Sequence, residues 1–229
     1  MTLNPPIGCF GGTFNPPHTA HFALVHSARE QLNLSKVLMI PAGQPWQKPQ
    51  VLPALQRVAM LRLAIDYDQS VWPKRSPYPL TLDTLEADLP SASYTINTLK
   101  TLRAQNPDTP LVWIMGSDQL KNLHTWHDWQ DLLDYAHIAV AQRAGHIVAR
   151  HELPDALQKI YSERVTSNMT QWRAQLSGHF IPFTLTALHV SSSAIRHAIA
   201  HGQNPQDIKQ LRPAVADYII EHHLYKENL

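Results

Sequence analysis

The positions of apolar residues divide the chain into two kinds of segment. One kind is the short, unbroken apolar run, which is typical of strands covered on both faces of a sheet. Such runs occupy residues 7–10, 36–41, 111–115 and 138–142. Residues 80–86 alternate instead between apolar and polar positions, which predicts a half-covered strand near a sheet edge.

Between these strands, apolar residues recur with helical spacing. We predict helices over residues 18–32, 54–67, 94–104, 154–165 and 213–225. The start of the third, Ser93-Tyr94-Thr95, predicts an N-cap by serine or threonine. Another helix is expected to follow Ser191-Ser192-Ser193 and to end at Gly202. Elsewhere between residues 145 and 183 the pattern is weak.

Apolar strands that alternate with helices are typical of an α/β fold with one doubly wound parallel sheet. The 229 residues are enough for a full hydrophobic core. We therefore expect one domain over residues 1–229, with a C-terminal helical subregion from about 191 to 229.

Composition narrows the function classes. The 19 Lys and Arg nearly balance the 18 Asp and Glu, which argues against a nucleic-acid or membrane surface. Cys9 is the only cysteine, so no internal disulfide forms, and its place in a strand favours a buried structural thiol. A signal-peptide pattern and a membrane-length apolar run are both absent, so we expect a cytoplasmic protein.

The first strand runs into a glycine turn that suits phosphate. It leads through Gly11-Gly12 and Pro16-Pro17 to a helix that begins near His18. The first N–H groups of a helix lack internal partners, and the helix dipole favours negative charge there. His18 and His21 are three residues apart, which places both imidazoles on one face of the first turn.

Other strand ends carry further candidates, because ligands of open α/β sheets collect at the carboxyl ends of strands. Lys48 lies in a proline-rich loop after the second strand and could hold a second phosphate. Arg196 lies one turn beyond the three serines and can fork two phosphate oxygens. Asp118, after Gly116, could bind a ribose, and Trp126 could stack on a flat ring.

This set favours nucleotidyl transfer. The Walker pattern GxxxxGK[ST] and the dinucleotide pattern GxGxxG are both absent, so histidines and an arginine would handle the triphosphate. Attack by a second substrate's phosphate can be direct and in line, and catalysis then depends on positioning and charge stabilisation. Zinc binding by His18 and His21 is disfavoured, because neither HExxH nor a cysteine pair accompanies them. We expect no protein metal site, and Mg²⁺ that arrives with ATP.

Residues 11–21, GGTFNPPHTAH, resemble the hallmark GGTFDPxHxGH of the nucleotidylyltransferase superfamily, with Asn15 and Ala20 as departures. The resemblance implies a Rossmann-like fold. Nearly the whole chain is similar to the bacterial nicotinate-nucleotide adenylyltransferases, through Ser93-Tyr94-Thr95, the segment 116–120 and the segment 191–196. That family joins ATP to nicotinate mononucleotide and releases deamido-NAD and pyrophosphate.

The resemblance implies roles for particular residues. His18, His21 and Arg196 would be catalytic. The ATP site would comprise Gly11, Gly12, Thr13, Phe14, Gly116, Asp118, Ser192 and Ser193. The mononucleotide site would comprise Lys48, Thr95, Trp126 and His127.

Three alternatives stay open. The acceptor could be nicotinamide mononucleotide or another phosphorylated compound such as phosphopantetheine. The chain could be a nucleotide-binding module without turnover, although retention of His18, His21 and Arg196 argues against this. A fragment of a class I aminoacyl-tRNA synthetase is disfavoured by short length and balanced charge. The sequence indicates no oligomeric state.

Overall fold

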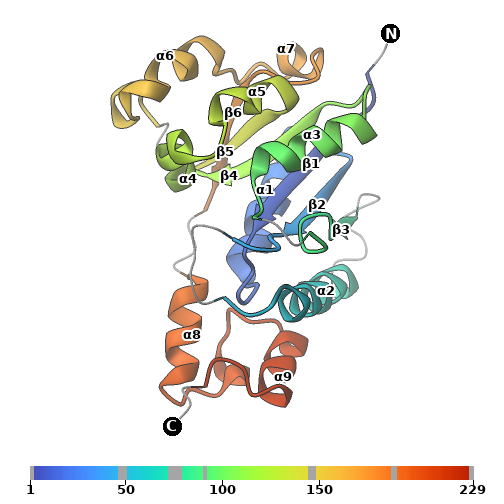
Figure 1. Ribbon diagram of the computed structural model, residues 1–229, viewed down its shortest axis with the longest axis vertical. Coiled ribbons are helices and arrows are strands. Elements are labelled where there is room, and N and C mark those ends of the chain that lie inside the picture. Colours follow the sequence, from blue (N-terminus) through green and yellow to red (C-terminus); the bar gives the residue numbers. More distant parts are fainter. Residues whose placement is uncertain are drawn as a thin grey trace. The chain divides into compact units, whose positions relative to one another are not determined.

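The computed structural model describes residues 3–45, 51–71, 79–89, 92–143, 148–186 and 190–226 (Figure 1). Its strands are β1 (Ile7–Gly12), β2 (Lys36–Pro41), β3 (Leu80–Leu82), β4 (Leu111–Gly116), β5 (His137–Arg143) and β6 (Phe180–Leu185). They form a six-stranded sheet in the order β3-β2-β1-β4-β5-β6. The pairs β1–β4, β4–β5 and β5–β6 are parallel. The predicted α/β class with a parallel sheet is confirmed.

Helices connect the strands. The α-helices are α1 (Thr19–Leu32), α2 (Ala54–Val71), α3 (Thr95–Gln105), α4 (Ser117–Asn122), α5 (Leu132–Tyr135), α6 (Asp155–Arg164), α7 (Met169–Arg173), α8 (Ser192–Ala200) and α9 (Pro213–Glu221). Within the described residues, the short 3-10 helices are η1 (Leu123–Thr125), η2 (Trp129–Asp131), η3 (Arg150–Glu152) and η4 (Pro205–Asp207). No helix in the described ranges is long and apolar enough to cross a membrane.

The sheet core is apolar, as the unbroken runs predict. All of Leu111–Met115 in β4 is buried, and Cys9 in β1 is fully buried, which confirms the prediction for its thiol. The structure corrects two strand predictions. β3 is only three residues long, and β6 was not predicted at all. Pro182 within β6 argues against a central strand, but β6 is the last strand of the order, where proline is tolerated.

Contacts between Cα atoms divide the chain into two compact units. The first comprises residues 1–11, 24–38 and 93–187, and the second comprises residues 12–23, 39–92 and 188–229. The prediction of a single domain over residues 1–229 stays a prediction. Within the second unit, α2 and α9 lie side by side (Figure 1), where Arg212 donates to Asp68 Oδ1 at 2.9 Å.

Helix ends match the sequence in part. Ser191 Oγ accepts from the Ala194 N–H at 3.1 Å, and Gly202 adopts φ +89° just after α8, so both predicted boundary residues are confirmed. The cap predicted for α3 is wrong. Tyr94 is its N-cap residue and makes no side-chain cap bond.

The first unit buries a histidine in its neutral form. His137 Nδ1 accepts from the His179 N–H at 3.2 Å, and Nε2 lies 3.1 Å from the Gln175 carbonyl oxygen. The neutral tautomer with the proton on Nε2 satisfies both atoms. Burial, which is the largest cause, and the nearby His179 and Arg103 together lower the pKa of His137 to about 4.

Because His137 is buried in its neutral form, we expect the folded protein to lose stability at acidic pH. In the unfolded chain a histidine binds its proton near pH 6.5, whereas folded His137 does so near 4. The contribution of neutral His137 to the free energy of unfolding is therefore fully present above about pH 6.5 and is lost as the pH falls toward 4. The loss amounts to roughly 3 kcal/mol at most for one such group. Urea melts across this range should show a shallower loss for His137→Gln. Exposed His151→Gln is the matched control, and an unchanged slope in His137→Gln would contradict the assignment.

Candidate active site

The predicted site residues fall into two groups, one in each unit. The second unit holds the loop between β1 and α1. Within it, Phe14 is buried and adopts φ +49°, a left-handed conformation that costs energy for a residue with a Cβ. A Cβ on Gly12 would lie 3.0 Å from the Phe14 ring. Glycine at position 12 therefore leaves room for this ring close to its own backbone.

The histidine pair lies at the start of α1, as predicted. The His18 and His21 rings are stacked, with centroids 3.7 Å apart and planes at 22°. His21 Nδ1 accepts from the His18 backbone N–H at 3.1 Å. An acceptor Nδ1 places the proton of neutral His21 on Nε2, which can then donate to a ligand.

His18 is more deeply buried than its partner. Its side chain is 6% exposed, and its Nδ1 has no hydrogen-bond partner among the described residues. Burial lowers the pKa of His18 to about 4, so the imidazole is neutral at pH 7. A bound phosphate would bring the negative charge that favours the protonated form.

The N-terminus of α8 is hydrogen-bonded to the loop between β1 and α1. Ser192 Oγ donates to the Pro16 carbonyl at 2.9 Å, and Arg196 Nη1 donates to the Asn15 carbonyl at 2.9 Å. Arg196 Nη2 also donates to Ser193 Oγ at 3.3 Å. These bonds leave other guanidinium N–H groups for a ligand. The start of α8 is therefore joined to the loop residues Asn15 and Pro16 that precede the histidine pair.

Asn15 is held on both sides. Its side chain is 2% exposed, and its Oδ1 accepts from the Tyr225 hydroxyl at 2.7 Å. Burial raises the pKa of Tyr225, so its hydroxyl remains a donor. The backbone carbonyl of Asn15 meanwhile binds Arg196. A residue near the end of the chain thus fixes the loop that precedes the histidines.

The first unit holds the remaining predicted residues. Tyr94 and His127 place their rings 4.5 Å apart at 31°. Trp126 follows η1, and its Nε1 is buried without a hydrogen-bond partner in the described ranges. Thr95 is the first residue of α3, and its side chain is half-buried.

At the end of β4 the backbone is accessible. Nothing lies within 4 Å of the position of a Cβ on Gly116, and Asp118 is exposed in the first turn of α4. Gly116 is the N-cap residue of α4, so Asp118 does not cap this helix. At the end of β1, a Cβ on Gly11 would lie 2.6 Å from the Trp113 ring, so this position also requires glycine.

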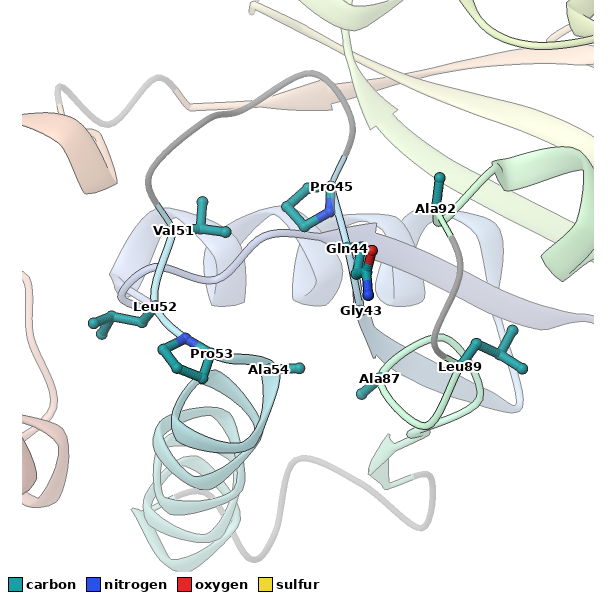
Figure 2. Close-up of a pocket in the computed structure, with 10 residues that line it drawn as sticks. All are labelled: Gly43, Gln44, Pro45, Val51, Leu52, Pro53, Ala54, Ala87, Leu89 and Ala92. Atoms are coloured by element: carbon teal, nitrogen blue, oxygen red, sulfur yellow. The ribbon is translucent and has the colours of Figure 1, made fainter.

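A pocket of about 630 Å³ lies in the second unit (Figure 2). Residues 43–45 and 51–54 form one part of its lining, and Ala87, Leu89 and Ala92 form another. Residues 43–45 and 51–54 stand before and after the part of the chain that carries Lys48, in the loop predicted to bind the acceptor. Lys48, the cation of that loop, lies outside the described residues.

Sequence reasoning assigned no site role to three residues. Tyr225 and Tyr94 gave no periodic signal, because their importance depends on tertiary contacts. Arg57 did give one. It occupies the first position of the buried face of α2, which continues through Met60, Leu61, Ala64, Ile65 and Asp68. A charged residue on an otherwise mainly apolar face predicts a specific buried role.

The fold defines an α/β protein with a doubly wound parallel sheet, and its histidine pair and serine-rich helix start lie where the sequence predicted phosphate-binding groups. Residues 9–198 match the cytidylyltransferase-like family model. The chain is 36% identical over 222 residues to the "Probable nicotinate-nucleotide adenylyltransferase" of Herminiimonas arsenicoxydans, covering 96% of each chain. It is 37% identical to the protein of that name from Bordetella pertussis, covering 96% of this chain and 98% of the relative. The chain therefore belongs to the cytidylyltransferase-like family and, within it, to the nicotinate-nucleotide adenylyltransferases.

Solved structures agree on the fold. The nicotinic acid mononucleotide adenylyltransferase of Plasmodium falciparum, complexed with NaAD, aligns with a TM-score of 0.68 at 18% identity and covers 97% of this chain and 98% of its own. A putative nicotinate-nucleotide adenylyltransferase from Vibrio parahaemolyticus aligns with a TM-score of 0.62 at 16% identity, covering 99% and 98%.

The bond from Tyr225 to Asn15 predicts a stability effect. In Tyr225→Phe the buried Asn15 Oδ1 loses this donor, so we expect the free energy of unfolding to fall by about 1–3 kcal/mol. Urea melts would measure this change. Tyr218→Phe on α9 is the control, with an expected change within about 0.5 kcal/mol. Equal effects of the two substitutions would contradict the role of the Asn15 bond.

Proposed function

We propose that the chain transfers the adenylyl group of ATP to nicotinate mononucleotide, giving deamido-NAD and pyrophosphate in NAD biosynthesis. The observation that carries this function is the stacked histidine pair at the start of α1, directly after a loop to which Arg196 is bound. Family membership supports the same reaction and the same two substrates. A cytoplasmic location stays a prediction.

The reaction needs no covalent intermediate. An oxygen of the mononucleotide phosphate attacks the α-phosphorus of ATP, a new P–O bond forms, and the bond to the β-phosphate bridging oxygen breaks. Negative charge shifts onto the departing pyrophosphate. His21 donates from Nε2 to a phosphate oxygen, while buried His18 supplies a second imidazole beside it.

The outer phosphates are assigned to α8. Its first N–H groups, including those of Ser192 and Ser193, the Ser193 hydroxyl and the remaining N–H groups of Arg196 are donors, whereas the Ser192 hydroxyl already donates to the Pro16 carbonyl. Arg196 can form a bidentate contact with phosphate, which a lysine could not. Gly11, Gly12, Thr13 and Phe14 would shape the loop against the nucleotide.

The remaining assignments concern the two ring systems. Asp118 is exposed beside the open backbone of Gly116, which supports a contact with the adenylate ribose. Thr95, Trp126 and His127 are assigned to the nicotinate ring. The paired rings of Tyr94 and His127 support this assignment, because they offer a flat aromatic surface. Lys48 is assigned to the mononucleotide phosphate.

Mg²⁺ is proposed as part of the ATP substrate. In the described ranges, no three His, Cys, Asp or Glu side chains gather as a metal site. Phosphate oxygens and water hold Mg²⁺ with few protein ligands. We derive no protein step that depends on the ion.

Pyrophosphate release tests the function. With ATP and Mg²⁺, we expect release with nicotinate mononucleotide and a much lower rate with nicotinamide mononucleotide, since we assign the nicotinate carboxylate to backbone N–H groups near Thr95 and His127. Preference for the amide would overturn the acceptor assignment and keep the chemistry. Absence of release with both acceptors would overturn the reaction.

Removal of the second histidine tests the mechanism. We expect His21→Ala to lower turnover by about 10²-fold or more, because it removes the Nε2 donor from the transition state. Its melting temperature should stay near that of the unchanged protein, since His21 is only half-buried. Exposed His201→Ala is the matched control. Turnover near normal in His21→Ala would exclude this imidazole from the mechanism.

A further inference from the structure

Arg57 binds three separate backbone segments with one guanidinium group. Nη1 donates to the Thr13 carbonyl at 2.9 Å, Nη2 to the Gly43 carbonyl at 2.8 Å, and Nε to the Leu52 carbonyl at 2.8 Å. The side chain is fully buried in the first turn of α2. Burial lowers the pKa of its guanidinium, and the nearby Tyr225 opposes this change.

The three carbonyls belong to the two loops that the proposed reaction uses. Thr13 lies in the loop that precedes the histidine pair, which is assigned to ATP. Gly43 and Leu52 lie on either side of the loop assigned to the acceptor, and both line the pocket shown in Figure 2. One rigid, planar group therefore sets the distance between the backbone of the ATP loop and both ends of the acceptor loop.

This arrangement is tight on the acceptor side. A Cβ on Gly43 would lie only 2.1 Å from the Glu86 carbonyl oxygen, so the backbone there has no room to shift toward Glu86. The carbonyl of the same Gly43 is bound by Arg57. A displacement of the Arg57 guanidinium is thus transmitted to the rim of the pocket.

We propose that Arg57 is a positioning residue that couples binding of ATP to binding of the acceptor mononucleotide. The inference rests on the proposed function. Contact of ATP with the loop at Thr13 favours one position of the Thr13 carbonyl, and Arg57 then holds residues 43 and 52 in the arrangement that the acceptor needs. Each substrate therefore tightens the other by the same factor, as thermodynamic linkage requires. Arg57 contacts neither reacting group.

Arg103 offers a matched comparison in the first unit. Its guanidinium also donates to carbonyls of several segments, those of Tyr135, Asn106, Thr109 and Leu176. None of these four residues belongs to the predicted site. Replacement of either arginine removes the same kind of interaction, but only replacement of Arg57 should disturb substrate coupling.

The experiment measures binding of α,β-methylene-ATP with Mg²⁺ by calorimetry, with and without saturating nicotinate mononucleotide. In the unchanged protein we expect the mononucleotide to lower the Kd of the analogue by about 5-fold or more. In Arg57→Lys, which keeps the charge but loses the three-way fork, the ratio of the two Kd values should approach one. In Arg103→Lys the ratio should stay as in the unchanged protein.

Steady-state kinetics provide a second readout. For Arg57→Lys, the KM for the mononucleotide at saturating ATP should rise several-fold, whereas at low ATP it should change little. A general loss of stability would not raise the KM for the mononucleotide at saturating ATP while leaving the KM at low ATP unchanged. Circular dichroism melts verify that each variant is folded. If Arg57→Lys does not fold, Arg57→Gln provides the same test, since it also loses the three-way fork and leaves no buried charge behind.

The outcomes separate the two proposals. A coupling ratio of one in the unchanged protein, or an unchanged ratio in a folded Arg57→Lys, would overturn the role of Arg57 while pyrophosphate release continues. Equal loss of coupling in Arg57→Lys and Arg103→Lys would also overturn it. Absence of pyrophosphate release in the unchanged protein would instead overturn the function on which the inference rests.

Discussion

The loop between β1 and α1 depends on other elements for the partners of its backbone carbonyls. A buried carbonyl without a partner costs free energy, and this loop has no regular structure to supply one. Arg57 binds the carbonyl of Thr13, Arg196 that of Asn15, and Ser192 that of Pro16. Three side chains from α2 and α8 therefore define the path of a segment in which Phe14 adopts a left-handed conformation.

The same contacts explain why binding groups lie on an otherwise irregular segment. A catalytic histidine on a mobile loop would lose the benefit of fixed geometry. Here the stacking of His18 on His21, together with the bond from the His18 N–H to His21 Nδ1, fixes one ring orientation and one tautomer. The carbonyl partners fix the backbone on the N-terminal side of the pair. Positioning therefore precedes ligand binding, as chemistry without a covalent intermediate requires.

Local patterns in the sequence predicted most of this architecture. Unbroken apolar runs located four strands, and the three serines located the start of α8 with its Ser191 cap. β6 could not be predicted from its own residues, because Pro182 is compatible with a strand only at a sheet edge, and edge position is a tertiary property. Tyr225 is separated from Asn15 by 210 positions, so no local pattern could have revealed their bond.

The departure at Asn15 acquires a physical meaning from these contacts. The side-chain oxygen of either an asparagine or an aspartate could accept the hydrogen bond from the Tyr225 hydroxyl, so this bond alone does not favour one residue over the other. They differ in charge. A carboxylate at this buried position would place a negative charge beside Arg196, which binds the carbonyl of the same residue. Asn15 keeps the hydrogen bond and leaves the positive charge of Arg196 uncompensated by this side chain. In a loop that is assigned to bind a triphosphate, the neutral residue thus preserves both the backbone path and the attraction for anions.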